Sequence, residues 1–222
     1  MHDTLKQLDF ITNKVNDIIN IKQLKTNPKI IAVTKTFSMD KITPLLQSGH
    51  IHYGENKLQE TEDKWSGVRD KYKNCRLHMI GKLQSNKAKK AVELFDYIHS
   101  LDSEKLASKL FHYQKELNKK VNLFIQVNLA NEIQKSGIPL SELNQFYNYC
   151  TKELSLNIIG LMCLPPFDSD SEEYFKILEK SAKNLNLADL SMGMSSDYEK
   201  ALLCGSTFLR LGTLLLGKRK VI

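Results

Sequence analysis

The chain has 222 residues and a formal net charge of +7, with 41% hydrophobic and 26% charged residues. This length can bury one sizeable core, and the composition is that of a globular protein without low-complexity tracts. No apolar run approaches the roughly 20 residues of a membrane span, and the N-terminus lacks the apolar core of a signal peptide, so we expect one cytoplasmic domain over residues 1–222.

The expected elements begin with an amphipathic helix over residues 3–24, within an N-terminal segment 1–26 that we expect to pack on the rest of the domain. The break at Asn27 and Pro28 is followed by an apolar, β-branched run that predicts a buried parallel strand ending at Lys35. An ammonium at such a strand end has two interpretations. It reaches solvent along its aliphatic stem, or burial lowers its pKa and makes the amine a nucleophile toward carbonyls.

Strands and helices then alternate to the end of the chain. Seven further strands are expected at residues 52–54, 77–80, 96–99, 121–127, 156–161, 187–192 and 207–211. Helices are expected at residues 39–47, 57–72, 85–93, 103–117, 141–152 and 171–186, and after Ser196 and Thr213. Eight βα units with short connections in a chain of this length favour a closed (β/α)8 TIM-type barrel over an open sheet.

Cysteine and histidine spacing gives little sign of a metal site. The cysteines are scattered without a CxxC pair: Cys75, Cys150, Cys163 and Cys204. This pattern argues against zinc and against a disulfide framework, and reduced thiols fit a cytoplasmic location. His50 and His52 could share one face of an extended segment, but no further ligand stands at a usual spacing, so we predict no metal.

Two basic clusters could attract phosphates or nucleic acid nonspecifically. They are Lys87, Lys89 and Lys90, and Lys218, Arg219 and Lys220. No recognition motif or interleaved aromatic residues accompany them, so solvated helix faces are the simpler interpretation. We therefore expect neither a specific nucleic acid nor a membrane as a partner.

Two loops near the end of the chain suit an anion, because barrels often bind phosphate after their last two strands. In residues 191–197, Ser196 and Glu199 have capping-box spacing, which places a helix start beside Ser195. In residues 210–213, Gly212 allows close approach to the backbone and Thr213 adds a hydroxyl. Together with Lys35, these loops predict a phosphate-bearing aldehyde held as a Schiff base, which in proteins usually means pyridoxal 5′-phosphate (PLP).

Eight ordered blocks of sequence resemble the pyridoxal phosphate homeostasis protein family. They are residues 32–36, 54–56 with Gln59 and Glu60, 78–87, 126–128, 135–137, 160–162 with Pro165 and Pro166, 190–197 and 210–212. The resemblance extends from about residue 30 to 219 and implies a fold type III PLP-binding barrel like the N-terminal domain of alanine racemase. Leu77, where the family often has an aromatic residue, and Lys82 depart slightly from its pattern.

The resemblance also implies roles for individual residues. Lys35 matches the Schiff-base lysine, and Arg210 matches the arginine that approaches the pyridine nitrogen. Three residues match the phosphate site: Ser195, Gly212 and Thr213. Two more fall at positions lining the cofactor: Asn56 and Met162.

The expected function is PLP binding without turnover. Arginine only donates hydrogen bonds, so Arg210 would leave the ring nitrogen unprotonated and the ring a weaker electron sink. The chain also ends at Ile222, without the second domain that supplies the opposing base in related racemases. These features predict a protein of vitamin B6 homeostasis, a monomer or weak dimer, that buffers PLP or delivers it to PLP-dependent apoenzymes.

Two alternatives remain open on the sequence. The first is a low-activity PLP-dependent amino-acid racemase or lyase that uses Lys35 with His78 or Tyr53 as the second base. His78 has a competing interpretation as a hydrogen-bonded core residue near a strand end. The second alternative is a barrel without cofactor that binds nucleic acid or protein, which the charge of +7 suggests.

Overall fold

Eight parallel strands form a closed barrel in the computed structural model, which describes residues 3–130, 132, 136–166 and 169–218. The barrel strands are β1 (Lys29–Val33), β2 (His52–Glu55), β3 (Arg76–Met79), β4 (Tyr97–Leu101), β5 (Asn122–Asn128), β7 (Ile158–Met162), β8 (Asp189–Met194) and β9 (Phe208–Leu211). Pairing runs from β4 through β1 and β9 to β5, and a β4–β5 pairing closes the ring. The predicted (β/α)8 barrel is confirmed.

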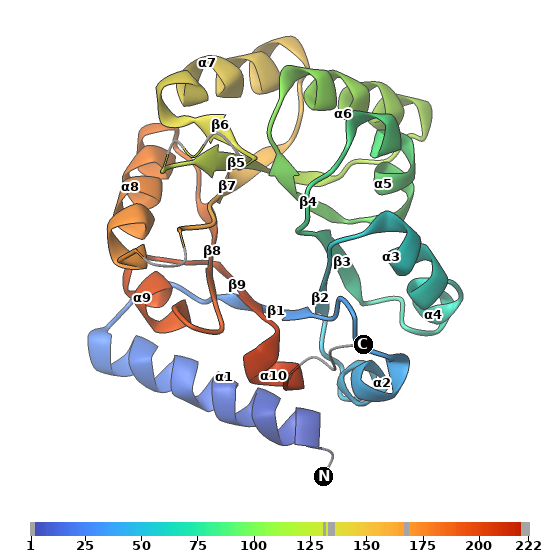
Figure 1. The fold of residues 1–222 in the computed structure, drawn as a ribbon, viewed down its shortest axis with the longest axis vertical. Helices are drawn as coiled ribbons and strands as arrows, with labels where there is room; N and C mark the ends of the chain where they lie inside the picture. Colours follow the sequence, from blue (N-terminus) through green and yellow to red (C-terminus); the bar gives the residue numbers. More distant parts are fainter. Residues whose placement is uncertain (1–2, 131, 133–135, 167–168, 219–222) are drawn as a thin grey trace.

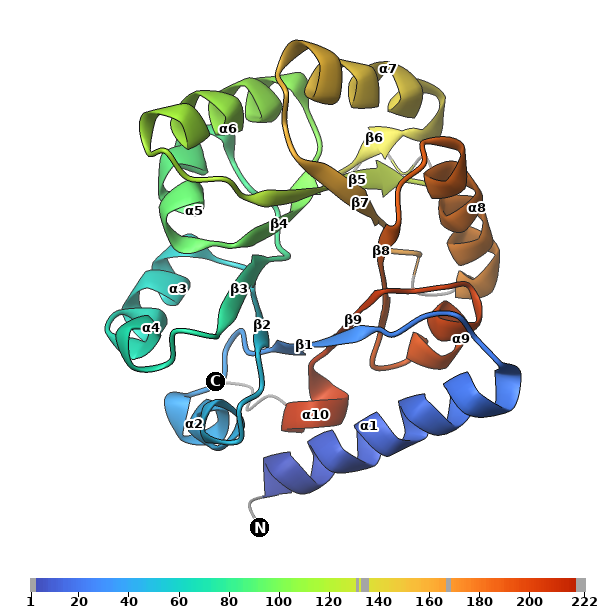
Figure 2. The ribbon, with the colours of Figure 1, turned by 180° about the vertical axis from the view of Figure 1, so that it is seen from behind.

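Helices surround the strands on the outside (Figures 1 and 2). They are α2 (Met39–Gln47), α3 (Leu58–Trp65), α4 (Val68–Lys71), α5 (Ala88–Leu94), α6 (Glu104–Glu116), α7 (Leu143–Asn148), α8 (Ser171–Asn184), α9 (Tyr198–Leu203) and α10 (Thr213–Leu216). Ser103 caps α6 as predicted, because its hydroxyl accepts a hydrogen bond from the Leu106 amide. Within the described residues, no helix is both long and apolar enough to cross a membrane.

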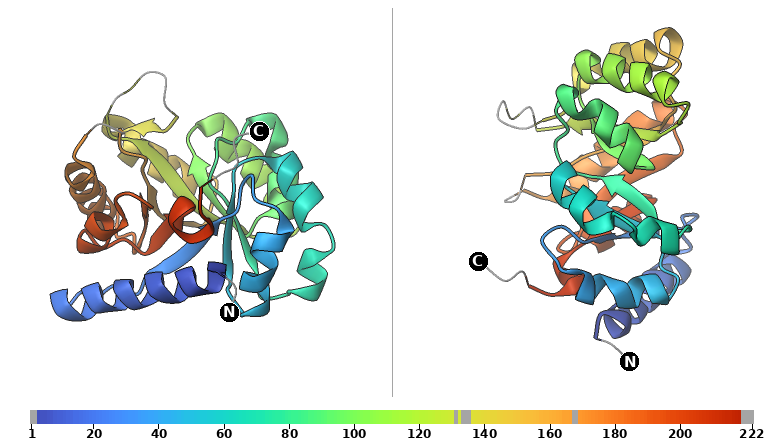
Figure 3. Two further views of the ribbon diagram at one scale, coloured as in Figure 1. Left: turned by 60° about the horizontal axis from the view of Figure 1, so that its bottom comes forward. Right: turned by 90° about the vertical axis from the view of Figure 1, so that its right-hand side faces the viewer.

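The N-terminal helix α1 (Asp3–Lys22) lies outside the barrel and contacts α2, α9 and α10 (Figure 3). Its buried side chains include Ile11 and Val15, which recur at helical spacing and join the main core. The predicted amphipathic opening helix is therefore present. Through α10 it supports the loop that follows the last strand.

Two predicted helices are divided in the structure. The expected helix 57–72 breaks between α3 and α4, where Gly67 adopts a φ of +72°. A left-handed residue cannot continue a right-handed helix, and glycine adopts this conformation at little cost. The expected helix 141–152 is a series of short pieces, η2 (Leu140–Glu142), α7 and the π-helical η3 (Tyr149–Glu153), which follow the short strand β6 (Ile138–Pro139).

The predicted capping box at Ser196 is wrong. The α9 helix begins at Tyr198 with Asp197 at the N-cap position, and no side chain caps it. Instead, the Asp197 carboxylate accepts a hydrogen bond from the Met194 amide at 2.6 Å and closes the turn itself. Serine and aspartate are equally acceptable cap residues, so the local sequence did not separate them.

The strands alternate between two buried faces. On β3, for example, Leu77 and Met79 face the main core under the helices, whereas His78 lies inside the barrel. A small apolar cluster also fills part of the barrel interior: Ile31, Phe124, Met162 and Phe208. Both faces are buried, as is typical of parallel barrels.

Candidate functional site

A cavity of about 420 Å³ opens at the carboxyl ends of the strands. Its walls come from the ends of β1, β8 and β9 and from the segments after β1, β2, β3, β7, β8 and β9. They contain Val33, Lys35, Asn56, Ile80, Leu164, Met194, Ser195, Ser196, Arg210, Gly212 and Thr213. Six of the seven residues proposed from the sequence therefore lie together in one cavity. The seventh, Met162, is fully buried in the interior cluster with Ile31, Phe124 and Phe208, and it is not among the lining residues.

One wall of the cavity combines two loops that are distant in the sequence. The Leu214 amide donates a hydrogen bond to the Ser195 hydroxyl at 3.2 Å, which ties the loop after β8 to the start of α10. The hydroxyls of Ser195 and Thr213 line the same cavity. Since α9 has six residues and α10 has four, individual hydroxyl and amide donors, rather than a long helix dipole, make this wall suitable for an anion.

Arg210 is buried, with 4% of its surface exposed, and two neutral groups hold it in place. Its guanidinium donates to the Ser191 hydroxyl at 2.6 Å and to the Cys163 carbonyl at 2.9 Å. Burial lowers the pKa of Arg210, although an arginine stays protonated at physiological pH. The cavity therefore has a fixed cationic donor in its wall, and this donor cannot accept a proton.

A continuous hydrogen-bonded chain runs from Arg210 through the barrel interior. Ser191 contacts His99 Nδ1 at 2.7 Å. His99 Nε2 and His78 Nδ1 are 2.9 Å apart, as are His78 Nε2 and His52 Nδ1. The interior of the barrel thus contains a row of hydrogen-bonded imidazole rings that starts behind the cavity.

In this hydrogen-bonded chain, only one direction of donation gives every donor an acceptor. Arg210 can only donate, so the Ser191 oxygen accepts from it and the Ser191 proton goes to His99 Nδ1. His99 then carries its proton on Nε2 and donates to His78, which in turn donates from Nε2 to His52. The opposite direction would leave the Ser191 hydroxyl proton without an acceptor among the described residues. The positive charge of Arg210 therefore sets the tautomer of the rings behind it.

These rings are held neutral. Burial is the main cause that lowers the pKa of His78 and of His99 well below the usual histidine value, and the Arg210 charge lowers the pKa of His99 further. Burial also lowers the pKa of His52 to about 4, with His50 and Lys29 adding repulsion. Neutral rings, each with one donor and one acceptor nitrogen, are what the chain requires.

Asn56 forms another part of the cavity wall and has an unsatisfied acceptor. Its side-chain oxygen is buried and has no hydrogen-bond partner among the described residues. Gly81 packs directly against Asn56, and a Cβ added at Gly81 would lie 2.5 Å from the backbone carbonyl oxygen of Asn56. A buried acceptor without a partner costs free energy, so this wall suits a ligand that brings a hydrogen-bond donor.

Neither side chain considered as a second base lines the cavity. His78 is fully buried and uses both ring nitrogens in the chain, which agrees with its interpretation as a hydrogen-bonded core residue. Tyr53 is also fully buried, and its hydroxyl donates to the His50 carbonyl at 3.0 Å. Among the described residues, no group of three or more His, Cys, Asp or Glu side chains could hold a metal ion.

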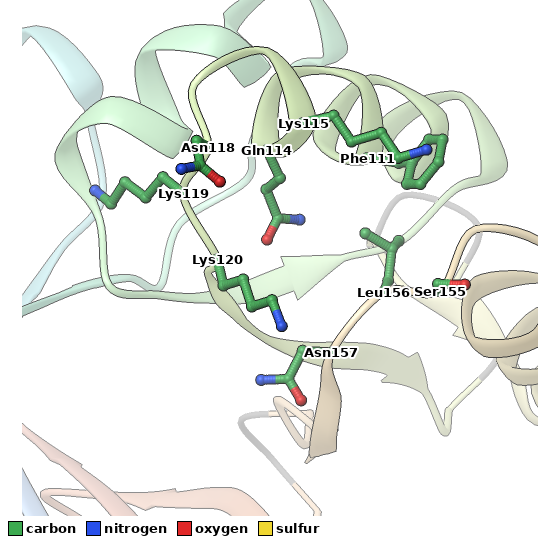
Figure 4. A pocket seen from close by; sticks show the side chains of 9 residues that line it. All are labelled: Phe111, Gln114, Lys115, Asn118, Lys119, Lys120, Ser155, Leu156 and Asn157. Atoms are coloured by element: carbon green, nitrogen blue, oxygen red, sulfur yellow. The ribbon is translucent and has the colours of Figure 1, made fainter.

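A larger cavity of about 730 Å³ lies at the opposite end of the barrel (Figure 4). It is formed by the end of α6 and by the segments that lead into β5 and β7. Lys115, Lys119 and Lys120 line it, but it contains none of the seven proposed residues. This cavity is the larger of the two, but the smaller cavity is the better candidate for a functional site, because its walls combine a lysine, an arginine and hydroxyl groups.

Sequence reasoning missed the supporting residues more than the lining ones. The sequence places Ser191 only within a loop and indicates no role for His99. The available signal was a polar residue within an otherwise apolar strand, as at His78 between Leu77 and Met79 and at His99 after Ile98. Lys135, Arg219 and Lys220, which belong to the family blocks or the basic clusters, lie outside the described residues.

Comparison with known proteins agrees with the fold. The family model for the N-terminal domain of alanine racemase matches residues 8–220. A pyridoxal phosphate homeostasis protein from Synechocystis sp. is 36% identical over 208 residues, covering 90% of this chain and 95% of that protein.

Two solved structures are also similar. PipY of Synechococcus elongatus PCC7942, in a structure with PLP bound, superposes with a TM-score of 0.79 at 32% identity, covering 91% of this chain and 100% of PipY. Alanine racemase from Clostridium difficile 630 superposes with a TM-score of 0.70 at 15% identity. There this chain is covered to 99% but the racemase only to 57%, and the likeness concerns the fold alone.

Proposed function

The chain belongs to the alanine racemase N-terminal domain family and, within it, to the pyridoxal phosphate homeostasis proteins, and on that premise we propose that its strand-end cavity binds PLP through Lys35. The observation that carries this proposal is the meeting of Lys35, Ser195, Arg210 and Thr213 in one cavity. These residues come from the ends of β1, β8 and β9 and from the start of α10. The PLP-bound structure of the related PipY supports it.

The chemistry of the walls fits the parts of this cofactor. The Lys35 amine would hold the aldehyde carbon, and the hydroxyls of Ser195 and Thr213 would donate to the phosphate. Arg210 would donate to the ring nitrogen, and Asn56 offers its unsatisfied oxygen to a hydroxyl of the ring. Bound PLP supplies an aldehyde that combines reversibly with amines and a ring that withdraws electrons from them.

In this proposal the protein is a PLP carrier in vitamin B6 homeostasis and not an enzyme. Arg210 cannot give a proton to the ring nitrogen, and the groups to which it donates hydrogen bonds, the Ser191 hydroxyl and the Cys163 carbonyl, are neutral. His78 is engaged inside the barrel and Tyr53 in the core under the helices, and neither lines the cavity wall. Retention of PLP and its delivery to apoenzymes in the cytoplasm then follow as the role, and the four buried free thiols agree with that location.

One experiment tests both the ligand and the lysine. The protein is loaded with PLP, reduced with borohydride and digested, and the modified residue is located by mass spectrometry. We expect the label on Lys35 and its loss in Lys35→Ala, whereas the matched control Lys87→Ala, outside the cavity, keeps it. A label on Lys87, Lys89 or Lys90 in the wild-type protein would contradict the assignment.

A second measurement separates a carrier from an enzyme. The loaded protein is incubated with single amino-acid enantiomers, and the composition of the mixture is followed by chiral chromatography. We expect no inversion and no keto-acid formation at enzyme-like rates. Turnover that disappears in Lys35→Ala would replace the carrier role with that of a racemase or lyase.

A further inference from the structure

The turn that carries Lys35 has a strained backbone. Lys35 lies two residues beyond β1, and the next residue, Thr36, adopts a φ of +66°. A β-branched residue rarely occupies this left-handed region, because its side chain is crowded by the backbone. Such a conformation persists only where neighbouring groups hold it.

Hydrogen bonds from one helix hold both neighbours of Lys35. The Thr36 amide donates to the Glu60 carboxylate at 2.5 Å. The Lys64 ammonium, one turn further along α3, donates to the Thr34 carbonyl at 2.9 Å. The backbone is therefore fixed immediately before and immediately after the lysine.

The two contacts belong to one ionic cluster. Lys64 also donates to Glu60 at 2.8 Å and to Glu55 at 3.0 Å, so one ammonium bridges two carboxylates. Glu55 is fully buried and accepts further hydrogen bonds from the Thr34 hydroxyl at 2.7 Å and from the Trp65 indole at 3.1 Å. A buried carboxylate is costly unless it is paired and hydrogen-bonded, and these contacts to Oε1 offset part of that cost, whereas Oε2 has no hydrogen-bond partner among the described residues.

Glu60 is ionised in this arrangement. Burial would raise the pKa of its carboxyl group, but the hydrogen bonds from Lys64 and from the Thr36 amide bring that pKa below the usual value. The cluster faces the turn and not the ligand, because Glu55, Glu60 and Lys64 are absent from the cavity wall. Its effect on a ligand must therefore pass through the backbone of residues 34–36.

We propose that Glu60 and Lys64, anchored by Glu55, are positioning residues that hold the strained Lys35 turn in place and thereby set the affinity for PLP. This inference rests on the proposed function for its ligand. A relaxed Thr36 would rotate the chain at Lys35 and move its amine relative to Ser195 and Arg210.

The test compares PLP affinity, measured by absorbance titration, among variants of α3 and of the turn. Glu60→Ala removes the acceptor while Lys64 keeps Glu55 and Thr34, and we expect affinity to fall about tenfold or more. Glu60→Gln keeps an acceptor for the Thr36 amide and stays within about threefold of wild type. The matched control Glu62→Ala removes a carboxylate from the same helix that pairs with Lys90, and it leaves affinity unchanged.

A double variant separates strain from simple loss of charge. Glycine adopts positive φ without crowding, so Thr36→Gly in the Glu60→Ala background restores most of the affinity. Wild-type affinity in Glu60→Ala would overturn the inference. So would a double variant that binds no better than Glu60→Ala, since the loss would then come from the missing carboxylate itself.

A measurement on the protein without PLP keeps the inference separate from the proposed function. A short hydrogen bond to a carboxylate shifts an amide proton downfield in the NMR spectrum, so the Thr36 amide should resonate downfield and move back in Glu60→Ala. An ordinary chemical shift for the Thr36 amide in the wild type would refute the proposed role of Glu60 in holding the Lys35 turn. If the wild type does not bind PLP but this shift is present, the hydrogen bond that holds the Lys35 turn is supported and the proposed function fails.

Discussion

The neutral histidine chain predicts that acid destabilises the fold well above the range in which carboxylates titrate. His78 and His99 have lowered pKa values in the folded protein, mainly because they are buried, whereas unfolding returns them to the usual value of about 6.5. Below this pH the unfolded chain binds more protons than the folded chain. The free energy of unfolding therefore falls as the pH falls, and the contribution is fully present only above about pH 6.5.

The size of the effect follows from the number of rings. Each histidine that stays neutral in the folded state costs about 1.4 kcal/mol per pH unit below its unfolded pKa, or about 2 kcal/mol between pH 6.5 and pH 5. His78 and His99 together then account for about 4 kcal/mol, out of the roughly 5–15 kcal/mol that usually stabilises a domain. His50 and His52, whose pKa values are also lowered mainly by burial, add to this loss. Lys29 and Arg210, the cations beside the chain, oppose protonation further.

Urea denaturation at pH 7, 6 and 5 at constant ionic strength measures this loss. The pKa of the Glu60 carboxyl group is lowered, so this carboxylate does not titrate in that window. His78→Leu lowers the absolute stability but should also reduce the pH slope, because one titrating group is gone. The control His112→Gln, at a ring with 63% of its side chain exposed, should leave the slope unchanged. A loss below about 1 kcal/mol between pH 7 and 5, or an unchanged slope in His78→Leu, would refute the reasoning.

Four further outcomes are expected. Ser191→Ala removes the 2.6 Å acceptor of Arg210, so PLP affinity in an absorbance titration should fall about tenfold, and an unchanged affinity would contradict the proposed role of Arg210. Gly81→Ala places a Cβ 2.5 Å from a backbone oxygen and should lower the free energy of unfolding by about 1–3 kcal/mol in urea, whereas Gly212→Ala meets nothing closer than 3.5 Å and should weaken PLP binding with little change in stability. Nitrogen NMR should find His78 and His99 neutral and protonated on Nε2, and protonation on Nδ1 would reverse the direction of the chain.

The order of the elements was largely predictable because it depends on local sequence. Apolar β-branched runs, Ser103 as a cap and the βα alternation each predicted a feature that the structure contains. The errors were also local. Gly67 divides a predicted helix and Asp197 replaces Ser196 at a helix start, and in both cases neighbouring residues offered the backbone two acceptable choices.

The cavity residues at strand ends were predictable for a topological reason. In a barrel of parallel strands every carboxyl end meets at one face, so Lys35, Ser195 and Arg210 had to approach each other once the βα order was known. Met162 shows the limit of this argument. It ends a strand, but its side chain points into the interior cluster instead of the cavity wall.

The sequence by itself determined the barrel, the strand-end face that carries the cavity and the lysine at that face. Only the tertiary structure decided what stands behind them: the chain from Arg210 to His52, and the Glu55, Lys64 and Glu60 cluster that holds the Lys35 turn. The physical reason is that both faces of a barrel strand are buried, so alternation alone does not tell which face is the interior. The partners of a buried polar side chain come from other strands and helices, and they are fixed only when the barrel closes.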